Sequence, residues 1–137
     1  MRIMKNGTPA GSDKCCIILG GGRMPLSTTK YDICSKKLTT LSEAPCRVFQ
    51  SSAVAIGDNV YVLGGAEEES IATIQVYSIR GDSWTTCTDT LETPRHGAAL
   101  VAIGDRMYLL GGQDENGRVL SSIEVFSAGQ INKGNIL

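Results

Sequence analysis

The side chains best suited to recognising another molecule are charged and polar groups in segments where loops are expected. Arginines and the single histidine supply hydrogen-bond donors, and the planar guanidinium group suits carboxylates on a partner peptide. Nearby glutamates and aspartates form a competing acidic cluster. The candidate protein-binding residues are Arg23, Arg47, Glu67, Glu68, Arg95, His96, Gln113, Asp114 and Arg118. For Arg47 and Arg95 a structural role, in which each ties a loop to nearby carbonyl groups, stays open.

These residues do not form a catalytic or metal-binding pattern. One histidine and five cysteines without metal-ligand spacing make a zinc site improbable, and no Ser-His-Asp or paired-carboxylate spacing stands out. The glycine run at 20–22 lacks the Gly-Lys-Ser/Thr ending of a phosphate-binding loop. We therefore expect no catalytic residue, no metal and no cofactor, and we predict that the chain is not an enzyme.

Composition narrows the class of partner. The 137 residues carry a formal net charge of -1, with 20% charged and 42% hydrophobic residues, and no long basic patch suggests nucleic acid. The first residues contain no apolar run of signal-peptide length, and no stretch approaches the ~18 apolar residues of a membrane span. We therefore expect a cytoplasmic protein that binds a protein or peptide, and neither nucleic acid nor membrane.

The elements that position these residues repeat along the chain. Residues 54–65 align with residues 101–112 at nine of twelve positions, and residues 74–78 match residues 123–127 at a slightly larger offset. A third, weaker copy begins at Leu19-Gly20-Gly21, which aligns with Leu63-Gly64-Gly65. A period in the upper forties indicates a repeat architecture.

Each unit reads as a small antiparallel sheet. Two short apolar runs flank a Gly-Asp pair, which predicts a type II′ hairpin, because glycine supplies the positive φ that this turn requires. A double glycine, a variable loop, a third strand with an aromatic residue and a fourth strand containing Trp84 follow. Such a sheet has two apolar faces and must stack on neighbouring sheets, as the blades of a β-propeller do.

This pattern resembles the kelch repeat, which carries a double glycine, an aromatic residue, a tryptophan and a Pro-Arg pair in order. The second copy meets the whole pattern with Pro94-Arg95 at its end, whereas the third copy has Lys133 in place of the tryptophan and the first has Leu38. The residues expected to have this structural role are Gly20, Gly21, Gly64, Gly65, Tyr77, Trp84, Gly111, Gly112 and Phe126.

The predicted fold is all-β, with kelch-type four-stranded antiparallel blades forming an incomplete ring. We expect an irregular segment at 1–12, because Pro9 and neighbouring turn residues disfavour a strand. We place a first repeat without its first strand at 13–46, a second repeat at 47–94, and a third with a degenerate fourth strand at 95–137. The tail is either a frayed end or a strand that completes another blade.

The resemblance implies a protein-interaction module. Kelch-like propellers present substrates to ubiquitin ligases through a separate amino-terminal domain, which this sequence lacks, and others bind actin. A kelch-like propeller also houses copper-dependent oxidase chemistry, but one histidine and four tyrosines do not supply its ligands. Two further hypotheses stay open: the chain is a fragment of a longer protein, or two copies close one ring.

Strands that alternate in direction place the expected binding loops at one end of each sheet. Loops between the second and third strands, and those that join successive blades, share this end, and loops that vary while strands repeat usually carry binding. The segments assigned to it are residues 23–28, 43–50, 66–72, 89–96 and 113–120.

Overall fold

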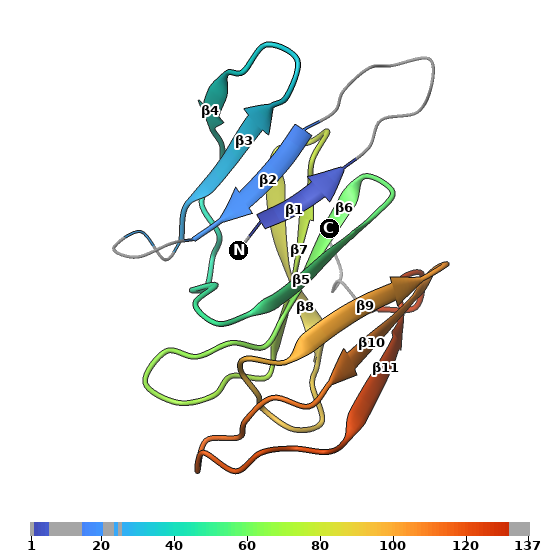
Figure 1. The fold of residues 1–137 in the computed structure, drawn as a ribbon. Coiled ribbons are helices and arrows are strands. Elements are labelled where there is room, and N and C mark those ends of the chain that lie inside the picture. The colour runs from blue at the N-terminus through green and yellow to red at the C-terminus, as the bar shows by residue number, and fades with distance from the viewer. Residues whose placement is uncertain (1, 6–14, 21–23, 25, 132–137) are drawn as a thin grey trace.

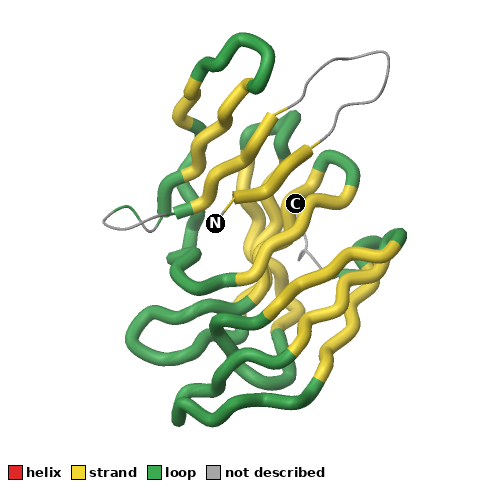
Figure 2. The backbone as a smooth tube through the Cα atoms, viewed as in Figure 1, coloured by secondary structure: helices red, strands yellow, loops and turns green. Residues whose placement is uncertain are grey.

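The computed structural model describes residues 2–5, 15–20, 24 and 26–131. Within these residues the chain consists of strands and loops with no helix (Figure 2). The strands form three antiparallel sheets that follow one another along the chain. Figure 1 shows the three sheets side by side, with the second between the first and the third.

The first sheet has four strands in the order β1 (Arg2–Lys5), β2 (Cys15–Leu19), β3 (Thr28–Asp32) and β4 (Leu38–Thr40). The prediction that this repeat lacks its first strand is wrong, because β1 pairs antiparallel with β2, from Arg2 opposite Ile18 to Lys5 opposite Cys15. Pro9 belongs to residues 6–14, outside the described part, so the turn-forming residues used in that prediction begin only after the strand.

The second sheet has four strands, β5 (Ser52–Ile56), β6 (Asn59–Leu63), β7 (Thr73–Ser78) and β8 (Ser83–Thr90), paired in chain order. Ile56 pairs with Asn59 across a two-residue turn in which Gly57 has φ +60°. Asp58, the second turn residue, is not in the positive-φ region, so the turn is the type II′ hairpin expected from the Gly-Asp pair.

The third sheet contains β9 (Ala99–Ile103), β10 (Arg106–Leu110) and β11 (Ile123–Ser127), with β10 in the middle. Gly104 has φ +63° at the turn between β9 and β10, which repeats the geometry of the second sheet. This sheet has three strands within the described residues, and Lys133, on which the expectation of a degenerate fourth strand rests, lies outside them.

Alternate side chains of the second sheet build two separate cores. On one face, Val60, Val62 and Tyr77 pack with Ile17 and Leu19 of the first sheet. The opposite face packs against the third sheet through a cluster that contains Tyr61, Leu63, Ile74, Val76, Met107 and Leu109. The first strands of adjacent sheets, β1, β5 and β9, are neighbours, so they form the inner side of the arc. Stacking through alternate faces is the arrangement of propeller blades.

The double glycines allow the loops that join the sheets to cross the strand ends closely. Gly64 has φ +64°, and a Cβ there would collide with the carbonyl oxygen of Arg95. Gly112 has φ +87°, and a Cβ there would lie 2.6 Å from the carbonyl oxygen of His96. Only glycine combines this backbone conformation with so close an approach.

Candidate functional site

The loops on which the candidate residues lie gather at one end of the sheets, which we call the loop end. It consists of residues 41–51 and 91–98, which join successive sheets, and the β6–β7 and β10–β11 loops. Backbone hydrogen bonds connect these segments: Ala66 N–H donates to Phe49 O at 3.0 Å, and Gly97 N–H donates to Gln50 O at 3.0 Å. The opposite end carries the tight turns that follow β5 and β9.

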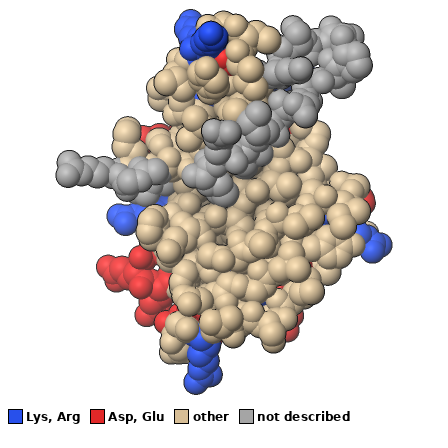
Figure 3. Space-filling view, viewed as in Figure 1, with Lys and Arg blue, Asp and Glu red and all other residues tan. Residues whose placement is uncertain are grey.

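A hollow at the loop end lies between the loop of residues 41–51 and the β6–β7 loop. Its lining is polar and mostly acidic: Arg47, Glu67, Glu68, Glu69, Ser70 and Ile71. Arg47 Nε lies 3.9 Å from Glu67 Oε1, and both side chains are more than half exposed, at 58% and 51%. In Figure 3 acidic side chains gather at the left edge of the molecule, where the β6–β7 loop lies. We call this feature the Glu67–Glu69 hollow.

The backbone of the β6–β7 loop is held in place beneath these carboxylates. Ala66 and Ser70 form an isolated antiparallel bridge, and Glu67 N–H donates to Glu69 O at 3.1 Å. Ile71 N–H donates to Gly65 O at 2.9 Å, which closes the base of the loop. The glutamate side chains therefore project from a hydrogen-bonded loop.

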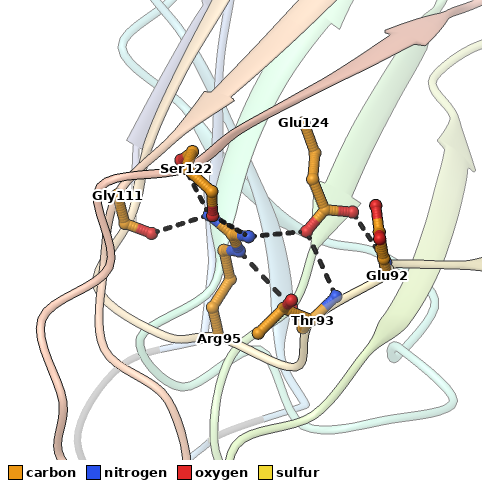
Figure 4. A network of polar contacts seen from close by, with 6 residues as sticks. All are labelled: Glu92, Thr93, Arg95, Gly111, Ser122 and Glu124. Atoms are coloured by element: carbon orange, nitrogen blue, oxygen red, sulfur yellow. Dashed lines mark hydrogen bonds and ion pairs between the residues drawn. The ribbon is translucent and has the colours of Figure 1, made fainter.

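Arg95 is not displayed to a partner, and its placement among exposed binding residues is wrong. Its side chain is 1% exposed and lies 2.7 Å from Glu124 Oε2, whose side chain is 10% exposed. The guanidinium also donates to the carbonyls of Thr93, Gly111 and Ser122 and to Ser122 Oγ (Figure 4). A buried guanidinium needs these acceptors. Thr93 O lies in the joining loop itself, and the others come from the third sheet and its β10–β11 loop. Arg95 therefore has the structural role that the sequence left open.

His96 and Gln113 connect the loop of residues 91–98 to the β10–β11 loop. Their backbones exchange two hydrogen bonds, with N···O distances of 3.1 and 3.0 Å. His96 Nδ1 lies 2.7 Å from Ser70 Oγ, so its ring connects the joining loop to the β6–β7 loop. The ring is half-buried and the Gln113 side chain is exposed.

Asp114 and Arg118 shape the tip of the β10–β11 loop. Asp114 Oδ1 accepts hydrogen bonds from the N–H groups of Asn116 and Arg118, both at 2.9 Å. The Asp114 carboxylate thus holds its own loop, and the exposed charged side chains of this loop are Glu115 and Arg118. Arg23 and Gly21 lie outside the described residues.

Trp84 and Tyr77 connect the first and second sheets beneath the loops. The Trp84 ring lies 5.1 Å from that of Tyr77, centroid to centroid, and packs on the core shared by the two sheets. Trp84 Nε1 donates to Thr28 Oγ1 at 3.2 Å and to Ser42 O at 3.0 Å, both in the first repeat. Phe126 occupies the position of Tyr77 in the third sheet, and packs against the core between the second and third sheets.

Asp82, in the turn between β7 and β8, connects the second sheet to Ser42 in the loop that leaves the first sheet. Its carboxylate accepts from Ser42 N–H at 2.9 Å and from the Tyr77 hydroxyl at 2.8 Å. The Ser42 amide lowers the pKa of Asp82 below its ordinary value, and the Tyr77 hydroxyl lowers it further. Burial raises the pKa of the Tyr77 phenol, and the hydrogen bond to Asp82 adds to this shift. The phenol is therefore a neutral donor to a charged acceptor.

Glu124 and Gln75, at equivalent positions of β11 and β7, are not among the residues predicted from the sequence. Gln75 is 1% exposed, and its Oε1 accepts from Cys46 N–H at 3.1 Å. Glu124 accepts from the N–H groups of Glu92 and Thr93 at 2.7 and 3.3 Å (Figure 4). Each side chain thus holds the loop that leads into its own sheet. A polar residue at the same place in two apolar repeat strands was the signal that could have identified them.

The described residues give no metal-binding geometry: no group of three or more histidine, cysteine, aspartate and glutamate residues is placed to hold an ion. The five cysteines differ in burial: Cys15, Cys16 and Cys87 are buried, Cys34 is exposed and Cys46 is half-buried. That the chain is not an enzyme stays a prediction. Across the part of the chain that the structure describes, no helix has the length and apolar character to span a membrane.

Antiparallel sheets that stack through alternate faces, with their joining loops at one end, define a partial β-propeller. The model of the kelch motif matches residues 47–90 and 94–128, which together make up more than half of the sequence. The chain therefore belongs to the kelch repeat family, and the predicted family and all-β propeller fold are confirmed. Kelch repeats generally form protein-interaction modules, and this sets the coarse functional class of the chain.

The chain is similar to a solved kelch β-propeller described as "Structure of YjhT". The TM-score between the two is 0.68 and the sequence identity is 22%. The similarity covers 74% of this chain and 32% of that chain, so it spans about a third of the longer protein. At this identity it shows the fold alone. The sequence matches none of the curated proteins with which it was compared.

Proposed function

We propose that the chain is a kelch-type interaction module whose Glu67–Glu69 hollow binds a basic segment of a partner protein. The observation that carries this proposal is the hollow itself, in which exposed charged side chains project from a loop fixed by backbone hydrogen bonds. A fixed loop loses little conformational entropy on binding, so its charges are available for recognition.

The charge balance of the hollow favours a partner with lysine or arginine. Arg47 already lies beside Glu67, and no ion pair joins the exposed side chain of Glu68 or Glu69 to another described residue. Arg95, which the sequence offered as a second donor here, is enclosed by Glu124 and carbonyl groups. A basic side chain in the hollow completes the pairing of these carboxylates, whereas an acidic one meets like charge. The half-buried Ile71 supplies an apolar contact.

Selection from a displayed library of random peptides tests this proposal. We expect the retained peptides to be enriched in lysine and arginine, and the variant Glu68→Lys/Glu69→Lys to retain none of them. A matched control, Asp105→Lys/Glu115→Lys, makes the same change in net charge at exposed positions outside the hollow. Peptides without basic enrichment, or equal loss of binding with the control, would exclude the hollow as the site.

We further propose that the chain is the substrate-binding part of a ubiquitin-ligase adaptor, as the kelch resemblance implies, and that the hollow binds the substrate. If so, the isolated chain competes with the intact adaptor for its substrate. Overexpression is then expected to lengthen the lifetime of a protein that contains the selected peptide, and the Glu68→Lys/Glu69→Lys variant is expected to leave it unchanged. If overexpression of the unmodified chain does not change this lifetime, the adaptor role is excluded. That result does not contradict peptide binding by the hollow.

A further inference from the structure

The face of the third sheet that points away from the second is apolar and exposed. Along its strands every second side chain faces inward, where Met107 and Leu109 are fully buried. The alternate positions on the outer strands point outward, and four of them are roughly half exposed or more: Val101 at 46%, Ile103 at 66%, Ile123 at 56% and Val125 at 53%. Val101 and Val125 flank Tyr108, and Ile123 pairs with Leu110, so these side chains form a contiguous apolar surface. The exposed Arg106 pairs with Ile103 and Ser127 at the turn edge of the same face.

The equivalent face of the second sheet shows which contact such a face makes. The equivalent side chains of the second sheet, one repeat earlier, pack against the third sheet. There Ile74 is fully buried and Val76 is 3% exposed, whereas their counterparts Ile123 and Val125 are more than half exposed. The matching pairs are Val54 with Val101, Ile56 with Ile103, Tyr61 with Tyr108, Leu63 with Leu110, Ile74 with Ile123 and Val76 with Val125. The outward face of the third sheet therefore has the residues of a sheet-to-sheet interface.

The first sheet carries the other half of the same kind of interface. Ile17 and Leu19 pack toward the second sheet, so Cys16 and Ile18 lie on the opposite face, with Tyr31 and Thr29 beside them in register. Cys16 is 5% exposed, and the other three residues are half-buried. The corresponding positions in the second sheet are Val60, Val62, Tyr77 and Gln75, and in the third Met107, Leu109, Phe126 and Glu124. In both later sheets this is the face that receives the preceding sheet.

These two faces lie at opposite ends of the arc, with the second sheet between them (Figure 1). They do not meet within one chain. We propose that two copies of this chain associate head to tail, the outward face of each third sheet packing on the first sheet of the other copy. Propellers close with about four to eight blades, and two copies of three sheets give six. A head-to-tail contact closes into a ring when the rotation between copies allows it, and repetition of the internal interface supplies that rotation.

The solution mass of the purified chain tests this proposal. Light scattering at micromolar concentration is expected to give twice the chain mass of 14.5 kDa. Val125→Lys places a charge in the interface and is expected to weaken association at least about 30-fold. The matched control is Val119→Lys, because Val119 is 81% exposed in the β10–β11 loop, away from this face. A monomeric chain, a series of larger assemblies, or a dimer that tolerates Val125→Lys would overturn the proposal.

Mixing two variants separates a head-to-tail contact from any symmetric one. Tyr31→Lys is expected to disable the receiving face and Val125→Lys the outward face, so each variant alone is monomeric. Their equimolar mixture retains one intact interface and is expected to form a one-to-one complex. Circular dichroism of each variant, matched to the unmodified chain, shows that the sheets are folded. A mixture that stays monomeric, with both variants folded, would contradict the head-to-tail arrangement.

Discussion

The guanidinium of Arg95 and the carboxylate of Glu124 lie 2.7 Å apart, with the Arg95 side chain almost completely buried. The pair fastens the loop that leaves the second sheet to the start of β11. The preceding interface has a neutral version, in which Gln75 holds the backbone of Cys46 and Arg47 stays exposed. The acidic residue thus accompanies the buried Arg95, and the amide accompanies the buried Val48, which has the equivalent place in the preceding loop.

Arg95→Met is expected to lower the free energy of unfolding by about 3 kcal/mol, because loss of one partner leaves the other charge buried without compensation. Urea denaturation measures the change. Glu124→Gln in the same chain restores the neutral pattern of Gln75, so the double variant is expected to be more stable than the sum of the single changes predicts. Strict additivity would show that the two residues do not act as a pair.

Trp84→Ala is expected to cost about 3 kcal/mol, toward the lower end for large aromatic residues, because the Trp84 ring is only half-buried. Trp84→Phe keeps most of the packing and removes the two hydrogen bonds of Nε1, so a loss of about 1 kcal/mol is expected. Thermal unfolding of both variants gives the comparison. An unchanged melting temperature for Trp84→Ala would mean that the ring does not join the first two sheets.

Gly64→Ala and Gly57→Ala separate backbone strain from steric contact. Both glycines have φ near +60°, but a Cβ at Gly57 meets no atom within 4 Å, whereas one at Gly64 collides with the Arg95 carbonyl. Gly57→Ala is therefore expected to cost about 1 kcal/mol from the left-handed conformation alone. Gly64→Ala is expected to cost clearly more and to disturb the loop that holds Arg95. Equal losses in urea denaturation would rule out the close approach.

Asp82 is expected to make stability depend on acid pH. Its pKa is lowered in the folded chain, so its charge contributes stability above the unfolded pKa of about 3.9, and this contribution is lost as pH falls through the lower folded value. Asp82→Asn removes the charge, and asparagine tolerates the φ of 46° at this position. The difference in urea midpoint between the two chains is expected to be larger at pH 7 than at pH 3. A difference independent of pH would exclude this role.

The repeat made most of the fold predictable. Nine identities between residues 54–65 and 101–112 fixed two hairpins and their Gly-Asp turns, and the positions of alternate apolar residues followed from strand geometry. The strand at Arg2–Lys5 was missed because nothing in the later repeats resembles it, and its pairing with β2 depends on the tertiary structure. Sequence similarity to the other copies was therefore a sufficient sign of a strand but not a necessary one.

The candidate site was less predictable, because burial of a charged side chain depends on partners distant in sequence. The hydrogen bonds of the two joining loops match His96 with Phe49, so Arg95 takes the place of the buried Val48. Arg47 lies one position earlier in its loop and is exposed. The buried guanidinium of Arg95 depends on Glu124, which follows it by 29 residues in the chain. The matching polar positions of β7 and β11 mark Gln75 and Glu124 in the sequence, but the loop group that each of them holds follows only from the sheet pairing.

Titration of the best-selected peptide tests most directly whether the Glu67–Glu69 hollow binds a basic segment. Fluorescence anisotropy is expected to show saturable binding that weakens with added salt, and a loss of at least about tenfold in affinity for Glu68→Lys/Glu69→Lys. The Asp105→Lys/Glu115→Lys control is expected to bind like the unmodified chain. Equal affinity of all three chains for the peptide would contradict the account.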